Sequence, residues 1–140
     1  MRRTTVFLFL GLFSLGCKGP IELAISGDDD MNEGNAVTVV YFQLTSNATF
    51  VNAPAATFWE NDNAALASDL AIAKQKLVLY PGRQETIEVT LAKDASYLGL
   101  AANYRNPDPQ GWRVIYPVDE VKGKKISLTV SHDRLFTEVH

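Results

Sequence analysis

Apolar residues alternate with polar ones in three separate stretches of this 140-residue chain, and this period of two is the feature that most constrains the fold. Successive side chains of a β-strand point to opposite faces, so each stretch predicts a strand with one buried and one wet face. The apolar positions are Ile21, Leu23 and Ile25; Ile87, Val89 and Leu91; and Ile126, Leu128 and Val130.

Three further stretches are apolar on both faces and predict strands that are covered on both sides. They are residues 37–44, 77–80 and 97–104. In the last of them, small residues at 99, 101 and 102 allow a neighbouring segment to approach closely. Turn-forming residues punctuate the strands at intervals of roughly eight to twelve residues. These turns are Pro81-Gly82, Asn106-Pro107-Asp108-Pro109, Lys122-Gly123 and His132-Asp133.

One segment, residues 57–73, lacks the β pattern and reads as helix or helical turns. Asn61 and its two neighbours are weak helix formers and favour a split into two short pieces. The chain is therefore expected to be mainly β: an antiparallel β-sandwich of about eight strands with a small helical insertion. At Pro81-Gly82 two readings stay open, because this pair suits a tight hairpin poorly and also fits a passage between sheets.

The N-terminus has the parts of a secretory signal peptide. Arg2 and Arg3 precede an uncharged apolar run over residues 6–15, and small residues surround Cys17. The run has about half of the roughly 20 residues needed to cross a bilayer. We therefore expect a signal peptide over residues 1–16 and a β-sandwich domain over residues 17–140.

The sequence around Cys17 resembles a bacterial lipobox, although Ser14 and Leu15 are not its commonest residues. That resemblance implies a diacylglyceryl group on the Cys17 thiol and, after cleavage, a further acyl chain such as palmitate on its amine. Lys18, in place of the Asp that resembles an inner-membrane retention signal, implies the periplasmic face of the outer membrane. The alternative is an ordinary signal peptide cut nearby, but no small-x-small site supports it.

Composition excludes several classes of function. Cys17 is the only cysteine, so an internal disulfide or a thiolate metal cage cannot form. The chain has 13 basic against 16 acidic residues, which argues against nucleic acid as a partner. His132 and His140 are the only histidines and show neither a triad nor zinc spacing, so we expect no enzyme, no catalytic residue and no cofactor.

An acidic stretch between the first two predicted strands is the strongest candidate site. Clustered carboxylates suggest calcium, but Gly34 falls one place late for an EF-hand, and Val39 stands where the bidentate glutamate belongs. We therefore predict no metal. Two readings remain, a solvated acidic loop and a loop that recognises a partner.

Several stretches, taken in order and spacing, resemble the TssJ family of outer-membrane lipoproteins of type VI secretion systems. They are residues 32–44, 66–70, 79–82, 97–105 and 112–113. The resemblance implies a transthyretin-like sandwich in the periplasm. It also implies that the loop between the first two strands, residues 27–35, binds the periplasmic C-terminal region of TssM, an inner-membrane protein. The residues expected to bind this partner are Asp28, Asp29, Asp30, Met31, Asn32, Glu33, Gly34 and Asn35, with Met31 as the apolar contact.

The sequence thus predicts a tether that couples two membranes through its lipid anchor and its loop. The alternative is a periplasmic lipoprotein that binds a small ligand or cell-wall glycan in a groove lined by aromatic residues. Candidates for such a lining are Tyr80, Tyr104, Trp112 and Tyr116, for which core packing is the favoured reading. Trp112 beside Arg113 is likewise expected to be a core aromatic flanked by a cation.

Overall fold

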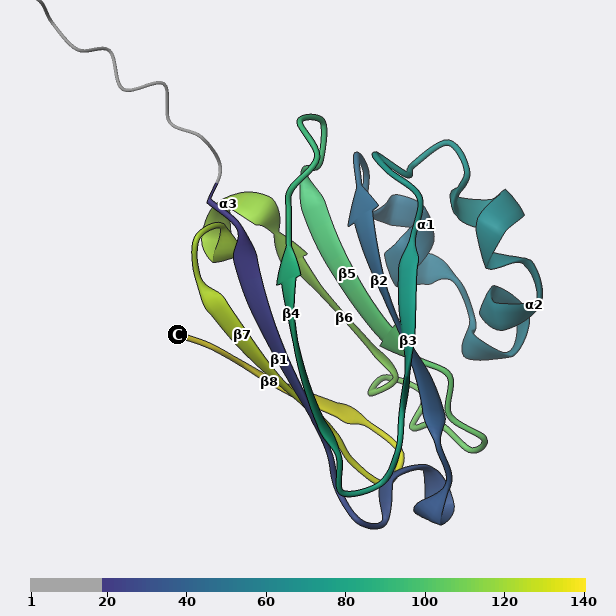
Figure 1. The fold of residues 1–140 in the computed structure, drawn as a ribbon. Helices are drawn as coiled ribbons and strands as arrows, with labels where there is room; N and C mark the ends of the chain where they lie inside the picture. Colours follow the sequence, from purple (N-terminus) through teal and green to yellow (C-terminus); the bar gives the residue numbers. More distant parts are fainter. Residues whose placement is uncertain (1–18) are drawn as a thin grey trace, which may run out of the picture.

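The computed structural model describes residues 19–140, which form two four-stranded sheets packed face to face (Figure 1). The predicted signal peptide and Cys17 lie outside the described residues. The first sheet has the order β4 (Gln84–Val89), β1 (Ile21–Gly27), β7 (Lys125–Val130), β8 (Leu135–Val139). The second has the order β3 (Gln75–Leu79), β2 (Val37–Leu44), β5 (Tyr97–Ala102), β6 (Arg113–Pro117). The predicted eight-stranded sandwich is confirmed.

One strand pair departs from the antiparallel expectation. β1 runs parallel to β7, with Leu23 opposite Ile126 and Ile25 opposite Leu128, whereas the other neighbours in both sheets are antiparallel. Alternating apolar residues are equally compatible with both directions. The pattern that correctly identified both strands therefore could not determine how they pair.

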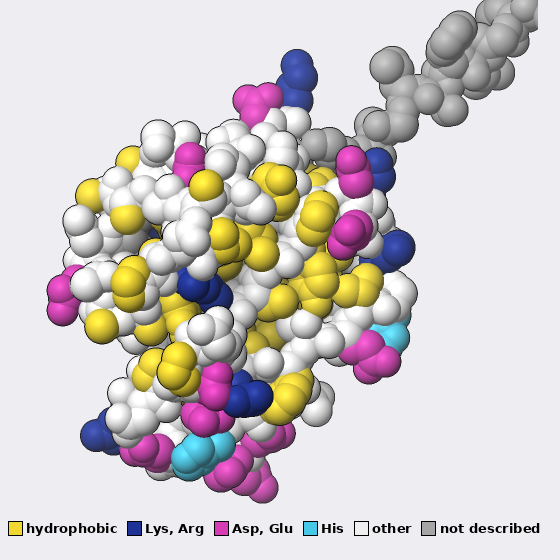
Figure 2. All heavy atoms as spheres, turned by 180° about the vertical axis from the view of Figure 1, so that it is seen from behind, with side chains coloured by type: hydrophobic (Ala, Val, Ile, Leu, Met, Phe, Trp, Pro, Cys, Tyr) yellow, Lys and Arg dark blue, Asp and Glu magenta, His cyan; other side chains and the backbone are white. Residues whose placement is uncertain are grey.

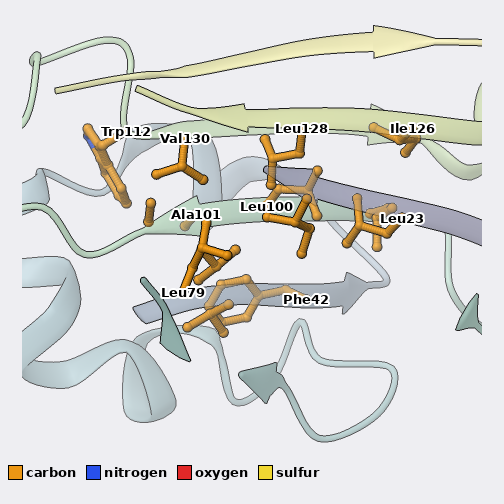
Figure 3. Packing of buried hydrophobic residues seen from close by; sticks show 14 of the residues in the cluster. Leu23, Phe42, Leu79, Leu100, Ala101, Trp112, Ile126, Leu128 and Val130 are labelled. Atoms are coloured by element: carbon orange, nitrogen blue, oxygen red, sulfur yellow. The ribbon is translucent and has the colours of Figure 1, made fainter. Parts of the chain in front are cut away.

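The core lies between the sheets, where the apolar faces of the strands meet. Leu23 of β1, Leu100 of β5 and Leu128 of β7 point toward one another (Figure 3), and each is fully buried. The alternating residues of β1 and β7 are buried in the same way, as predicted. Packing of these faces, rather than any covalent link, stabilises the sandwich.

The prediction that residues 77–80 are covered on both sides is wrong. Residues 77–79 belong to β3, which is an edge strand of the second sheet, and Tyr80 directly follows it; Val78 and Tyr80 are 53% and 60% exposed. Only Leu79 is buried, facing the core. The apolar character of these residues indicates a strand covered on both faces, but the helices do not cover the outer face of this edge strand.

Helices α1 (Ala48–Asn52) and α2 (Ala55–Leu66) lie against the outer face of the second sheet (Figure 1). The predicted helix over 57–73 therefore begins earlier and ends sooner, and the expected break is found at Asn61, whose φ is −146°. Residues 69–71 instead lie along the end of β2, where the N–H of Ala71 donates to Gln43 O at 2.8 Å. A third helix, α3 (Val118–Val121), was not predicted.

Among residues 19–140, no helix combines the length and the apolar character that crossing a bilayer requires.

An aromatic cluster joins the helices to the second sheet. Phe58 lies 5.8 Å from Phe42, 5.9 Å from Phe50 and 5.0 Å from Trp112, measured between ring centroids. Gly99 makes room for it, because a Cβ there would lie 2.9 Å from the Phe50 ring. The expected close approach at Gly99 is thus confirmed, and its neighbour is α1.

Trp112 and Arg113 have the structural roles that the sequence favoured. Trp112 is 1% exposed, and the Arg113 guanidinium lies 4.5 Å from its ring centroid. The same guanidinium donates to the carbonyls of Phe50 and Val51 at 2.7 and 2.6 Å, at the end of α1. A cation at the carbonyl end of a helix interacts favourably with the helix dipole. Arg113 therefore holds α1 on the sheet.

The turn at Pro81-Gly82 passes from one sheet to the other, because β3 and β4 belong to different sheets. Gly82 has a φ of +71°, a conformation that glycine adopts without strain. Its N–H donates to Gly27 O at 3.1 Å, which places this crossing beside the end of β1.

Gly99→Val is expected to destabilise the domain by about 1–3 kcal/mol, because the new methyl groups must displace the Phe50 ring from a packed cluster. Urea unfolding monitored by tryptophan fluorescence measures the change. In the double variant with Phe50→Ala the two costs should be less than additive. Equal free energies of unfolding for Gly99→Val and the parent chain would contradict this packing.

Candidate functional site

The acidic loop of residues 28–35 joins β1 to β2 at the lower end of the sandwich in Figure 1, and Gly19 lies at the upper end. At the upper end, Gly19 O accepts a hydrogen bond from the N–H of Gly123 at 3.2 Å. The seven residues of β1 separate the two ends by about 23 Å. The loop therefore projects from the end of the domain that lies away from the N-terminal entry of the chain.

The loop contains three consecutive residues in the left-handed region. Asn32, Glu33 and Gly34 have φ values of 47°, 59° and 77°, within a short 3-10 turn, η1 (Met31–Gly34). For residues other than glycine this conformation is strained by about 1–3 kcal/mol each and persists only where the surroundings hold it. Two buried side chains of the loop do so.

Met31 is the first of them, and its predicted role as an exposed partner contact is wrong. Its side chain is fully buried in the main hydrophobic cluster. A Cβ built at Gly27 would lie 2.5 Å from the Met31 sulfur, so the chain can fold over Gly27 only because that residue has no side chain. Met31 anchors the loop to the core from inside.

Asn32 is the second, and it is 4% exposed. Its Nδ2 donates to Ala36 O at 2.9 Å, and its Oδ1 accepts from the N–H of Arg105 at 2.7 Å. Its own N–H donates to His132 O at 2.9 Å. The side chain of Asn32 thus joins the loop to the β5–β6 connection, and its backbone N–H joins it to the β7–β8 connection. The residue type alone did not distinguish this role from an exposed loop position.

The remaining loop residues face the solvent. Asp28, Asp29, Asp30 and Glu33 are all exposed. Neighbouring groups orient three of them: Ser131 Oγ donates to Asp28, His132 Nδ1 lies 3.6 Å from Asp30, and Asn106 Nδ2 donates to Glu33 at 2.5 Å. Figure 2 shows acidic side chains gathered around a histidine at this lower end. The loop presents a fixed negative surface.

Within residues 19–140 no three acidic, histidine or cysteine side chains are grouped in a way that could hold a metal ion. What the arrangement supports chemically is electrostatic attraction of a basic surface.

The β5–β6 connection, residues 103–112, is itself braced against the β7–β8 turn. Tyr104 Oη donates to Arg134 O at 2.7 Å, and burial raises the pKa of this phenol. The Arg134 guanidinium also pairs with Asp108. The N–H of Gln110, and then Arg134, hold the pKa of the Asp108 carboxyl below its ordinary value. These contacts hold the wall beside the acidic loop in place.

The aromatic side chains named as a possible ligand groove do not form one. Tyr104 and Trp112 are buried, Tyr116 bonds Thr137 across the strands at 2.5 Å, and Tyr80 is exposed directly after the edge strand β3. A different groove of about 610 Å³ lies between the start of α2 and the β5–β6 connection. Pro54, Ala56 and Trp59 line one wall, and Tyr104, Arg105 and Pro107 line the other.

The two histidines do not form a catalytic arrangement with their neighbours. His140 Nε2 lies 3.1 Å from Ser127 Oγ and 3.9 Å from Glu138 Oε2. A relay requires the carboxylate on one ring nitrogen and the hydroxyl on the other, whereas here both contact the same nitrogen. His132 contacts Asp30 at the surface.

Comparison with known proteins gives a consistent result. Residues 20–133 match the family described as Type VI secretion lipoprotein, VasD, EvfM, TssJ. The crystal structure of the lipoprotein TssJ1 from Pseudomonas aeruginosa has a TM-score of 0.77 at 20% identity, over 88% of this chain and 97% of that chain. At that identity the likeness shows the fold alone. No curated protein matches the sequence.

Two further structures contain chains that resemble this one. A chain of a type VI membrane complex has a TM-score of 0.78 at 27% identity, over 86% of this chain and 98% of that chain. A chain of the structure described as the T6SS protein TssM C-terminal domain from EAEC has a TM-score of 0.72 at 25% identity, over 85% and 97%.

Asn32→Ala is expected to destabilise the domain by about 2 kcal/mol, because the partly buried N–H of Arg105 and carbonyl of Ala36 lose their partner and alanine must adopt a left-handed conformation. Asn32→Gly loses the same bonds but adopts the backbone freely, so its cost should be smaller. Chemical denaturation of both variants measures the difference. Unchanged stability in Asn32→Ala would refute the bracing role of this side chain.

Proposed function

The chain belongs to the type VI secretion lipoprotein family, and on that basis we propose that it is a non-enzymatic tether of the secretion membrane complex. Cys17 carries the lipid anchor at the periplasmic face of the outer membrane. The loop of residues 28–35 binds the periplasmic C-terminal region of TssM. The observation that carries this proposal is the placement of a rigid acidic loop at the end of the domain away from Gly19.

The anchor half of the proposal rests on the sequence and on the family. Cys17 lies two residues before Gly19, so a lipid there attaches to the upper end of the sandwich in Figure 1. One acyl chain binds a membrane reversibly, whereas two or more hold a protein there almost permanently. With the anchor at that end, the loop points away from the outer membrane, toward a partner that reaches across the periplasm.

The loop half rests on rigidity and charge. Because Met31 and Asn32 already hold the backbone, binding does not have to order the loop, and less of the interaction free energy is lost. The exposed carboxylates attract a basic partner surface and exclude an acidic one. The resemblance to chains in a type VI membrane complex and in a structure of the TssM C-terminal domain supports TssM as that partner.

Reversing the charge of the exposed loop tests the partner directly. In the double variant Asp29→Lys and Asp30→Lys, affinity for the TssM C-terminal region should fall about tenfold or more. Two carboxylates that attract a basic partner surface are replaced by ammonium groups that repel it. Isothermal titration measures the dissociation constant. The backbone supports of the loop are untouched, since neither side chain is buried.

The matched control is Asp119→Lys with Glu120→Lys, an adjacent exposed acidic pair on α3 with the same change in net charge. It lies at the opposite end of the domain and should leave the affinity unchanged (Figure 1). Equal affinity in the loop variant and the parent chain would count against the loop as the binding site.

Replacing the anchor tests the membrane half. Cys17→Ser cannot accept a thioether-linked lipid, so the full chain should leave the outer-membrane fraction. Density-gradient fractionation and the mass of the N-terminal peptide report the change. Lys18→Ser is the neighbouring control and should remain in the outer membrane. A Cys17→Ser protein that still sediments with the outer membrane would overturn lipid anchoring.

A further inference from the structure

We infer that the partner surface is larger than the loop: the groove between α2 and the β5–β6 connection receives an apolar anchor side chain from the same partner. This inference rests on the proposed function and adds the chemistry of the partner segment. The segment carries a large aromatic or aliphatic side chain, with basic groups on the side that faces Asp29 and Asp30.

The size of the loop requires a larger surface. A specific interface buries about 800 Å² on each partner and involves some 20–30 residues a side. Only six residues of the eight-residue loop are exposed: Asp28, Asp29, Asp30, Glu33, Gly34 and Asn35. A stable complex must therefore include the surface beside the loop.

The composition of the loop requires an apolar neighbour. The affinity of interfaces is concentrated in a few apolar or aromatic anchors seated in pockets, surrounded by a polar rim. Because Met31 is buried, the exposed residues of the loop supply a rim and no anchor site.

The groove is continuous with the loop. The N–H of Arg105, one of its lining residues, donates to Asn32 Oδ1 at 2.7 Å, and the next residue, Asn106, donates to Glu33. The wall of the groove and the loop therefore form one hydrogen-bonded unit. A partner that covers Glu33 meets the rim of the groove at once.

The groove is also preformed. Trp59 is held edge-on to Phe58, with centroids 5.0 Å apart, and its ring centroid lies 5.9 Å from that of Trp112. Tyr104 is fixed by its bond to Arg134 O. The volume of about 610 Å³ is within the range of about 300–1,000 Å³ that small-molecule pockets have, and it accommodates a large side chain without rearrangement.

Charge indicates a second feature of the partner segment. The Arg105 guanidinium is exposed, and within residues 19–140 it takes part in no ion pair. It therefore offers a cation to a carboxylate or carbonyl next to the anchor side chain. The acidic loop and the Arg105 guanidinium thus offer opposite charges to the partner segment.

Ala56→Trp tests the groove, because Ala56 is an exposed residue of α2 that lines it and the indole fills the space. The matched control is Ala65→Trp, on an exposed position of the same helix that does not line the groove. The full lipidated chains are titrated in detergent with the TssM C-terminal region from the same bacterium. Ala56→Trp should weaken binding about tenfold or more, and Ala65→Trp should not change it.

The outcomes separate this inference from the proposed function. If Ala56→Trp binds as tightly as the parent chain while Asp29→Lys with Asp30→Lys binds weakly, the groove is excluded and the loop remains. If Tyr80→Ala weakens binding and Ala56→Trp does not, the interface follows the β3 edge and the inference is overturned. If none of these variants weakens binding, the proposed function fails as well. Should Ala56→Trp not fold, Arg105→Glu at the rim makes the same test and should also weaken binding.

Discussion

Strand β1 is the constraint on which the rest of the molecule depends. It lies between β4 and β7, and its alternating apolar residues are buried almost completely in the core. Its first residue follows the segment that carries Cys17, and its last residue, Gly27, directly precedes the acidic loop. A strand hydrogen-bonded on both sides cannot shift by one residue without exposing its whole apolar face. The pairing of β1 on both sides therefore fixes the distance between the two ends of this strand, and so between the proposed anchor and the loop.

The loop divides its residues between those that hold its backbone and those that face the solvent. Met31 and Asn32 point inward and hold a backbone that contains consecutive left-handed residues, whereas the carboxylates point outward. Strain of this kind persists only where the surrounding structure compensates for it. The same amide of Asn32 that holds the loop also positions Arg105 at the rim of the groove. The surface proposed for recognition is thus assembled from connections that are far apart in sequence and hydrogen-bonded to one another.

Local patterns in the sequence predicted local structure well and long-range neighbours poorly. Alternation located β1 and β7 correctly, and the small Gly99 was correctly expected to admit a neighbour. The prediction that β3 is covered on both faces was wrong because β3 lies at the edge of its sheet, where the helices leave Val78 exposed. The sequence indicates an exposed apolar contact at Met31, because the sequence alone does not show that Gly27 leaves room for the Met31 sulfur. The groove could not be foreseen at all, because its walls come from residues 54–59 and 103–109, which only the fold brings together.

The proposed function places the lower end of this domain against TssM in the assembled membrane complex. The most direct measurement is site-specific photocrosslinking in cells, with a photoreactive amino acid at position 30 of the loop and, in a separate strain, at position 119 of α3. A crosslink to TssM is expected from position 30 and none from position 119. A crosslink to TssM from position 119 alone would contradict it.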